Sequence, residues 1–215
     1  MYRMYDKLKK KFGQNFLIDE NILNKISNLI SDNDLNILEI GPGIGNLTDY
    51  ILNSYPNKLS LVEIDKDLVL ILKKKYKENK LINIFNQNIL NFEFDEEFDL
   101  VISNLPYNIS SQILVKICLL KNKPNKLILM FQKEFGQRLV EKKLNSLNSL
   151  VNCFYDIKLS FNVSKNCFKP VPKIDSSVII LVKKKVTFIH ENEVNNFIIF
   201  KRNLFSYKRK SLNNL

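Results

Sequence analysis

The stretch Glu39-Ile40-Gly41-Pro42-Gly43-Ile44-Gly45-Asn46-Leu47-Thr48 decides the fold, because it joins an apolar run to a helical pattern through three glycines. Glycine lets the backbone approach a ligand closely where any Cβ would collide. The G-x-G-x-G spacing is one residue shorter than the dinucleotide pattern, and Pro42 lacks the amide donor that a pyrophosphate would need. The loop therefore disfavours NAD, and a plain strand-to-helix turn remains the alternative.

Apolar runs of strand length alternate with helical patterns on both sides of this loop. Such alternation predicts an α/β fold whose parallel sheet is covered by helices on both faces. The last two runs predict an antiparallel hairpin at the sheet edge, which gives a mostly parallel sheet of seven strands. The predicted strands are 36–40, 58–63, 82–86, 100–103, 126–131, 155–162 and 176–182, and the predicted helices are 47–54, 66–77, 110–120 and 133–142, with a further helical pattern after 185.

A carboxylate and an amide follow the second and third predicted strands. Glu63 comes twenty residues after Gly43, where a carboxylate can accept hydrogen bonds from both hydroxyls of a ribose. Asn88 is placed to hydrogen-bond the edge of an adenine ring, with an ordinary turn asparagine as the alternative. The glycine loop and the spaced acid together indicate a cofactor that contains a nucleoside.

The fourth strand runs directly into Asn104-Leu105-Pro106-Tyr107. In a doubly wound sheet the first and fourth strands are neighbours, so their carboxyl-end loops share one crevice. Gly41 and Asn104 should therefore face the same ligand.

The residue types in this turn suit methyl transfer from a sulfonium to an exocyclic amine. The lone pair of adenine N6 is delocalised into the ring, and two acceptors, the Asn104 side-chain oxygen and the Leu105 carbonyl, would favour a pyramidal nitrogen. Pro106 restricts Leu105 to an extended backbone, which directs that carbonyl. Tyr107 offers a flat face for a base rotated out of its stack. A proline turn with a half-buried tyrosine is the alternative interpretation.

Further motifs occur in order along the chain, and together with the two turns they resemble the small-subunit (16S-type) ribosomal RNA adenine-N6 dimethyltransferases (the KsgA family). The resemblance extends from Lys11 to the last residue and implies a Rossmann-like, class I S-adenosylmethionine-dependent methyltransferase. The further motifs are Gln14-Asn15-Phe16-Leu17, Phe131-Gln132-Lys133-Glu134 with Arg138-Leu139, Phe168 to Ser176, and Lys208-Arg209-Lys210 before Leu212.

The resemblance implies S-adenosylmethionine as methyl donor and two adjacent adenosines in the 3′-terminal hairpin loop of small-subunit rRNA as substrate, within a partly assembled small subunit. It implies Phe168 as a second stacking face for the target adenine, with a core aromatic beside prolines as the alternative. The donor contacts that it implies are Asn15, Leu17, Gly41, Glu63, Asn88 and Asn104.

Three features depart from the family pattern. Asn88 stands where the family usually has aspartate, which predicts weaker donor binding. Leu147-Asn148-Ser149-Leu150 replaces a more glycine-containing pattern, and the chain stops soon after Leu212, where relatives continue into a further helical segment. We therefore expect a methyltransferase domain over 1–185 with a basic N-terminal arm, and a short, truncated C-terminal helical RNA-binding segment over 186–215.

The charge balance points to a polyanionic partner. The chain has 215 residues, with 33 Lys and Arg against 22 Asp and Glu, and a net charge of +11. Five basic residues fall in 1–13 and five in 201–215, so nucleic acid is the expected partner. Cys118, Cys153, Cys167 and a single His190 predict no disulfide framework and no metal site. No apolar run reaches the length of a bilayer span, and we expect a soluble, cytoplasmic monomer that contacts no membrane.

Three alternative functions stay open. The large-subunit (23S) rRNA methyltransferase of the macrolide-resistance type shares the glycine loop, but Asp175 and the closing Lys-Arg-Lys cluster favour the small-subunit enzyme. A non-catalytic RNA-binding assembly factor on the same scaffold would tolerate loss of Asn104 or Tyr107, and both are present. A nicotinamide dehydrogenase is disfavoured by the glycine spacing.

Overall fold

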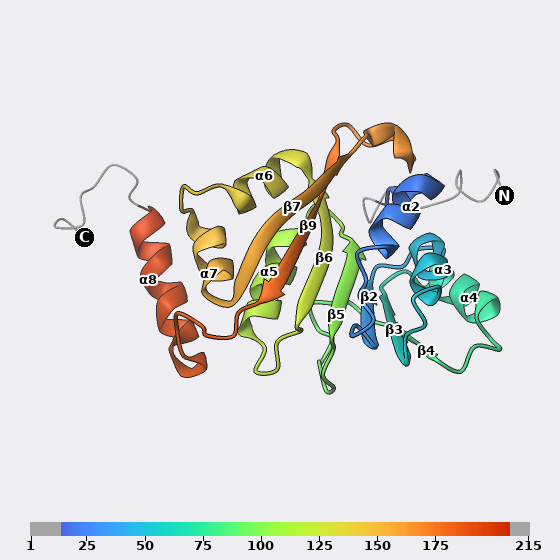
Figure 1. The fold of residues 1–215 in the computed structure, drawn as a ribbon, viewed down its shortest axis with the longest axis horizontal. Helices are drawn as coiled ribbons and strands as arrows, with labels where there is room; N and C mark the ends of the chain where they lie inside the picture. The colour runs from blue at the N-terminus through green and yellow to red at the C-terminus, as the bar shows by residue number, and fades with distance from the viewer. Residues whose placement is uncertain (1–13, 207–215) are drawn as a thin grey trace.

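Seven strands form the central sheet of the structure, a computed structural model that describes residues 14–206 (Figure 1). Their order across the sheet is β4-β3-β2-β5-β6-β9-β7. The bounds are β2 (Asn36–Ile40), β3 (Lys58–Glu63), β4 (Ile82–Asn86), β5 (Leu100–Asn104), β6 (Lys126–Gln132), β7 (Tyr155–Val163) and β9 (Ser176–Lys183).

The pairing of these strands confirms the predicted topology. Strands β4, β3, β2, β5 and β6 are parallel, and β9 runs antiparallel to both β6 and β7. Each of the seven predicted strands is present, with bounds that differ by at most one residue. Strands β2 and β5 are neighbours, as the doubly wound arrangement requires, so the loops at their carboxyl ends meet at one edge of the sheet.

Helices cover both faces of the sheet because successive strand residues point to opposite sides. In β2, Ile37 belongs to one hydrophobic cluster and Leu38 to another. The first cluster takes side chains from α2 (Glu20–Ser27), α3 (Asn46–Leu52) and α4 (Lys66–Lys75), and the second from α5 (Ser110–Leu119), α6 (Lys133–Val140) and α7 (Ser146–Phe154). The predicted two-sided cover is confirmed.

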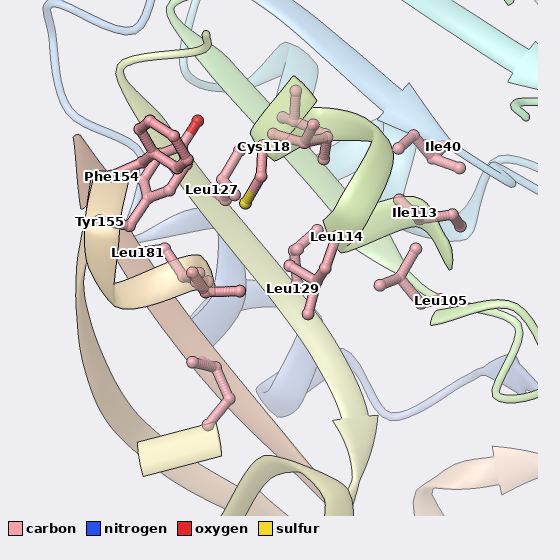
Figure 2. Packing of buried hydrophobic residues seen from close by; sticks show 14 of the residues in the cluster. Ile40, Leu105, Ile113, Leu114, Cys118, Leu127, Leu129, Phe154, Tyr155 and Leu181 are labelled. Atoms are coloured by element: carbon pink, nitrogen blue, oxygen red, sulfur yellow. The ribbon is translucent and has the colours of Figure 1, made fainter. Parts of the chain in front are cut away.

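The second cluster is the larger, and helix α5 supplies its centre. Figure 2 shows Ile113, Leu114 and Cys118 of α5 beside Leu127 and Leu129 of β6, all of them buried. Burial raises the pKa of the Cys118 thiol to about 12, so this cysteine behaves as an inert apolar side chain.

Two helices, α2 and α7, were not predicted. The Asp19 side chain caps α2 by accepting from the Ile22 amide at 3.0 Å. Helix α7 occupies the stretch where the family pattern is broken, and it begins with a capping box in which Asn145 and Asn148 each accept a backbone N–H of the other. The two asparagine side chains therefore satisfy backbone N–H groups at the start of this helix.

A short two-stranded ladder joins the start of the described chain to its later part. Strand β1 (Phe16–Leu17) pairs antiparallel with β8 (Phe168–Lys169), which follows the 3₁₀ turn η2 (Lys165–Cys167). This pairing brings residues 14–17 over the edge of the sheet where the β2 and β5 loops end.

The predicted helix after 185 is α8 (Val194–Ser206), which follows the 3₁₀ turn η3 (Glu191–Glu193), packs on α7 and lies beyond the β7 edge (Figure 1). Its Lys201 is only 5% exposed, and the ammonium donates to the Ser146 carbonyl at 2.6 Å. Lys201 therefore anchors α8 and does not belong to the predicted basic surface. The predicted basic arm over 1–13 and the Lys208-Arg209-Lys210 cluster lie outside the described residues. Within 14–206, no helix has the length and apolar character needed to cross a membrane.

Candidate active site

One pocket at the carboxyl ends of the parallel strands brings together the two turns singled out in the sequence. The glycine loop between β2 and α3 forms one wall, and the turn between β5 and α5 forms another. Nine of the ten predicted site residues line it: Asn15, Leu17, Gly41, Glu63, Asn88, Asn104, Leu105, Pro106 and Tyr107.

The glycine loop needs glycine for two separate reasons. Gly41 and Gly43 have φ angles of 64° and 63°, in the left-handed region that residues with a Cβ rarely adopt. A Cβ on Gly41 would meet no atom within 4 Å, so this position leaves open space in the pocket wall. A Cβ on Gly43 would lie 2.7 Å from the Phe16 ring. The loop thus exposes backbone to the pocket and also packs against residue 16.

Glu63 is the buried carboxylate beside the glycine loop in this pocket. It is 5% exposed, and its two oxygens accept from the Gly43 amide at 3.1 Å and the Asp65 amide at 2.9 Å. Burial raises the pKa of Glu63, while these backbone hydrogen bonds oppose the rise. Each oxygen keeps a second lone pair, so the carboxylate can still accept from two ligand hydroxyls.

Glu39 is a second buried acid behind the glycine loop. Thr48 donates to one of its oxygens at 2.6 Å, and burial raises the Glu39 pKa from 4.5 to about 8, with the nearby Asp49 and Glu63 charges acting in the same direction. A pKa of about 8 favours the neutral acid of Glu39 at neutral pH.

The raised pKa of Glu39 predicts a pH-dependent stability. The unfolded chain releases this proton near pH 4.5 and the folded chain near pH 8, so between these values the folded state binds more protons and the free energy of unfolding falls as pH rises. Glu39→Gln stays neutral in both states and keeps an acceptor for Thr48. We expect its melting temperature to fall less than the parent's across this window, measured by circular dichroism. Parallel curves for the two proteins would contradict a protonated Glu39.

On the opposite wall, Asn104 has a fixed orientation. Its amide nitrogen donates to the Asn15 carbonyl at 2.8 Å, and the side-chain oxygen is thereby left facing away from that contact as an acceptor. The Leu105 side chain is 2% exposed and lies in the core cluster, and its amide donates to the Met130 carbonyl at 3.3 Å. The Asn104 side chain and the Leu105 backbone are therefore both held in place by hydrogen bonds.

Asn88 lines the pocket, but its side-chain oxygen already accepts from the Leu90 amide at 2.9 Å. This is the turn geometry that was the alternative interpretation of the residue. An amide oxygen has two lone pairs, so the turn and a contact to an adenine edge can coexist.

The structure does not bring Phe168 to the pocket, and its role as a stacking face stays a prediction. Its side chain is 1% exposed and packs in the cluster that contains Leu17 and Val178. The cause is the β1–β8 pairing, which places Leu17 directly opposite Phe168. A buried ring has no free face, so the core aromatic, the alternative interpretation, describes it in this structure.

Gln14 is a pocket residue that the sequence interpretation missed as a ligand contact. Its amide nitrogen donates to Asp65 at 3.3 Å, and its side-chain oxygen is buried without a hydrogen-bond partner. A buried acceptor without a partner is costly unless a ligand supplies the donor. The signal was present, because Gln14 begins the motif that also contains Asn15 and Leu17.

The residues present fit S-adenosylmethionine, the donor that the family resemblance implies. The open space at Gly41, the carboxylate of Glu63 and the unpaired oxygen of Gln14 supply room for backbone approach, an acceptor for ribose hydroxyls and an acceptor for an N–H group. Within residues 14–206, no group of three or more His, Cys, Asp or Glu side chains is placed to hold a metal ion.

Comparison with known proteins identifies the family of this chain. The family profile described as "Ribosomal RNA adenine dimethylase" matches residues 5–215. A protein named "Ribosomal RNA small subunit methyltransferase A" in Malacoplasma penetrans is 43% identical over 96% of this chain and 77% of its own length. Its namesake in Mycoplasmopsis pulmonis is 42% identical over 96% of this chain and 83% of its own length.

A solved structure also matches. The crystal structure of a dimethyladenosine transferase from Plasmodium falciparum superposes with a TM-score of 0.81 at 30% identity, and the match covers 93% of this chain and 74% of that one. The fold is therefore that of a class I S-adenosylmethionine-dependent methyltransferase. With the family profile and the relatives in agreement, the chain belongs to the ribosomal RNA adenine dimethylase family.

Proposed function

We propose that this chain dimethylates N6 of two adjacent adenosines in the 3′-terminal hairpin loop of small-subunit rRNA, with S-adenosylmethionine as donor. The observation that carries the proposal is the single pocket into which the Glu63 side and the Asn104 turn both open. The names of the relatives support the small-subunit substrate.

On the donor side, the chain binds and orients. S-adenosylmethionine supplies a methyl group on a sulfonium, which is electrophilic without help from an acid or a metal. Glu63 accepts from the ribose hydroxyls, and Gly41 allows close approach of the backbone. Asn88 contacts the adenine edge, while Asn15 and Leu17 close the pocket from the N-terminal side.

On the acceptor side, two oxygens hold the amine. The Asn104 side-chain oxygen and the Leu105 carbonyl each accept one N–H of the target N6, so its lone pair is no longer spread into the ring and points toward the donor. The N–C bond forms as the C–S bond breaks, and the amine then releases one proton to solvent. The rate acceleration therefore comes from positioning the amine against the methyl group, and methyl transfer requires no general base with a shifted pKa.

Pro106 and Tyr107 shape the place where the base lies. Pro106 lacks an N–H and keeps Leu105 extended, so the Leu105 carbonyl keeps its direction. The half-exposed Tyr107 ring lines the pocket and offers a face for the flipped base, a contact worth about 1–3 kcal/mol. The chain's one histidine, His190, is exposed and is not among the residues that line this pocket.

Primer extension distinguishes this function from the large-subunit alternative. After incubation of each rRNA with the protein and the donor, dimethylated adenosine stops reverse transcription because its Watson–Crick edge is blocked. We expect stops in the 3′-terminal hairpin of small-subunit rRNA. Stops in large-subunit rRNA would assign the macrolide-resistance type of activity, and stops in neither would leave an RNA-binding assembly factor.

We further propose that the protein acts as a cytoplasmic monomer on a pre-assembled small subunit and takes part in its biogenesis. In this proposal residues 1–185 form the methyltransferase unit with its basic arm, and residues 186–215 form a helical RNA-binding segment.

The excess of basic residues predicts a steep salt dependence of RNA binding. A protein that neutralises about five phosphates should lose affinity with a log-log slope of roughly −3.5 to −4.5. Neutralising Lys208, Arg209 and Lys210 together should make the slope shallower, measured by fluorescence anisotropy with a labelled hairpin. A flat salt dependence in the parent would show that phosphate contacts do not contribute to RNA binding. An unchanged slope in the variant would show that Lys208, Arg209 and Lys210 make none of these contacts.

A further inference from the structure

The Tyr107 side chain is held by a residue far away in the sequence. Its hydroxyl and the hydroxyl of Ser176 lie 2.8 Å apart and form a hydrogen bond. The backbone on the Tyr107 side is also fixed, because the Ile109 amide donates to the Pro106 carbonyl at 3.2 Å and the Ser110 hydroxyl donates to the Tyr107 carbonyl at 3.1 Å. With the backbone fixed, the remaining freedom is rotation of the ring, and a bond at the phenol oxygen removes it.

Ser176 is itself rigidly placed. It is 0% exposed and begins β9, where it is paired with Gln132 of β6 on one side and Val163 of β7 on the other. The backbone carbonyl of the preceding residue, Asp175, accepts from the Lys133 amide at 3.0 Å. The Ser176 backbone is therefore held on both sides by the antiparallel part of the sheet.

We infer that Ser176 is a positioning residue for methyl transfer: its hydroxyl holds the Tyr107 ring in the orientation on which the flipped adenine stacks. The inference rests on the proposed function and adds the residue that sets this orientation. A ring that is already fixed loses no rotational freedom when the base stacks on it. The free energy of stacking is then available to hold N6 beside the Asn104 and Leu105 oxygens. Of the two predicted stacking residues, Tyr107 lines the pocket, whereas Phe168 is 1% exposed and does not.

The protonation state of Tyr107 agrees with this role. Burial raises the pKa of the phenol, and the hydrogen bond with Ser176 opposes the rise. The ring therefore remains a neutral phenol at physiological pH, and its face is not altered by titration.

A double-mutant cycle tests the inference through kinetics. Ser176→Ala and Tyr107→Phe each remove the hydrogen bond and keep the ring, and each should lower kcat/KM for the RNA hairpin about 3- to 10-fold while the KM for S-adenosylmethionine stays unchanged. The double variant should be no slower than Tyr107→Phe, because Ser176 acts only through that hydroxyl. Additive losses would overturn the inference. If Ser176→Ala does not fold, Tyr107→Phe alone tests the inference. Full activity of Tyr107→Phe, which lacks the phenol hydroxyl, would overturn it.

A matched control and a spectroscopic readout separate positioning from general stability. Ser177 is also 0% exposed, and its hydroxyl donates to Asn162 at 2.7 Å, away from Tyr107. Ser177→Ala should keep parent kinetics. In a hairpin with 2-aminopurine at the target position, stacking on Tyr107 should quench emission in the parent and in Ser177→Ala, and Ser176→Ala should relieve part of the quenching. Equal quenching in all three would contradict the inference.

These outcomes do not overlap with failure of the proposed function. If the parent protein leaves these adenosines unmethylated both in the hairpin and in assembled small subunits, the proposed function is wrong whatever the variants do. If the parent methylates the hairpin but the Ser176 and Tyr107 losses add, only the positioning role is wrong.

Discussion

Asn104→Ala should lower kcat for methylation of the rRNA hairpin by about 10³-fold while the affinity for RNA changes little. The Asn104 oxygen is one of two acceptors that orient the target amine, and its direction is set by the hydrogen bond from its amide nitrogen to Asn15. Losing one preorganised polar partner at the reacting atom costs about 10²–10³ in kcat, and release of residue 15 adds a loss of positioning. Single-turnover kinetics at saturating RNA and donor measure this step directly.

Asn108→Ala is the matched control for this prediction. Asn108 lies in the same turn but is exposed and does not line the pocket, so its removal should leave kcat within about twofold, inside the ±0.5 kcal/mol of an ordinary surface substitution. Near-parent rates for Asn104→Ala would show that the amine is not held in this way. A large loss of RNA affinity would show that Asn104 serves binding.

Glu63→Gln should weaken S-adenosylmethionine binding by about 10²-fold, although the two side chains have the same shape. Both Glu63 oxygens accept backbone N–H groups, from Gly43 and Asp65. A glutamine must present its NH₂ to one of these donors, which breaks either the link between β3 and the glycine loop or the turn at Asp65. The substitution also removes the charge that strengthens both hydrogen bonds, each worth about 1.5–3 kcal/mol. Isothermal titration calorimetry with the donor gives the change in Kd.

The exposed Glu78 provides the control for the donor-binding prediction. It lies outside the pocket, so Glu78→Gln should bind the donor like the parent. A Glu63→Gln protein that binds the donor within about threefold of the parent, a difference below 1 kcal/mol, would remove Glu63 from the donor site.

The parts of the site that follow from strand order could be predicted from the sequence. Parallel strands place their carboxyl ends at one edge, so a glycine loop after β2 and an Asn-Leu-Pro-Tyr turn after β5 had to meet once the two strands were neighbours. The apolar runs define these strands well because each is buried on both faces. The residues at the ends of these strands accordingly line one pocket.

The parts that depend on contacts between distant, weakly patterned segments could not be predicted. Burial of Phe168 follows from its pairing with Leu17, and each strand of that ladder is two residues long, too short for a periodic pattern. Helix α7 was missed because Asn145 and Asn148 look like loop residues, although that spacing is also a capping signal. The hydrogen bond between Tyr107 and Ser176 joins two motifs that are far apart in the sequence, so no local pattern predicts it.

Mass spectrometry of the 3′-terminal small-subunit rRNA hairpin, after reaction with S-adenosylmethionine carrying a deuterated methyl group, tests the central claim most directly. It reports which nucleoside, which atom and how many methyl groups are involved. A pocket in which the donor side of Glu63 and the acceptor side of Asn104 converge predicts labelled N6,N6-dimethyladenosine at two adjacent positions. Label at another atom or another nucleoside, or no label with folded protein and bound donor, would contradict it.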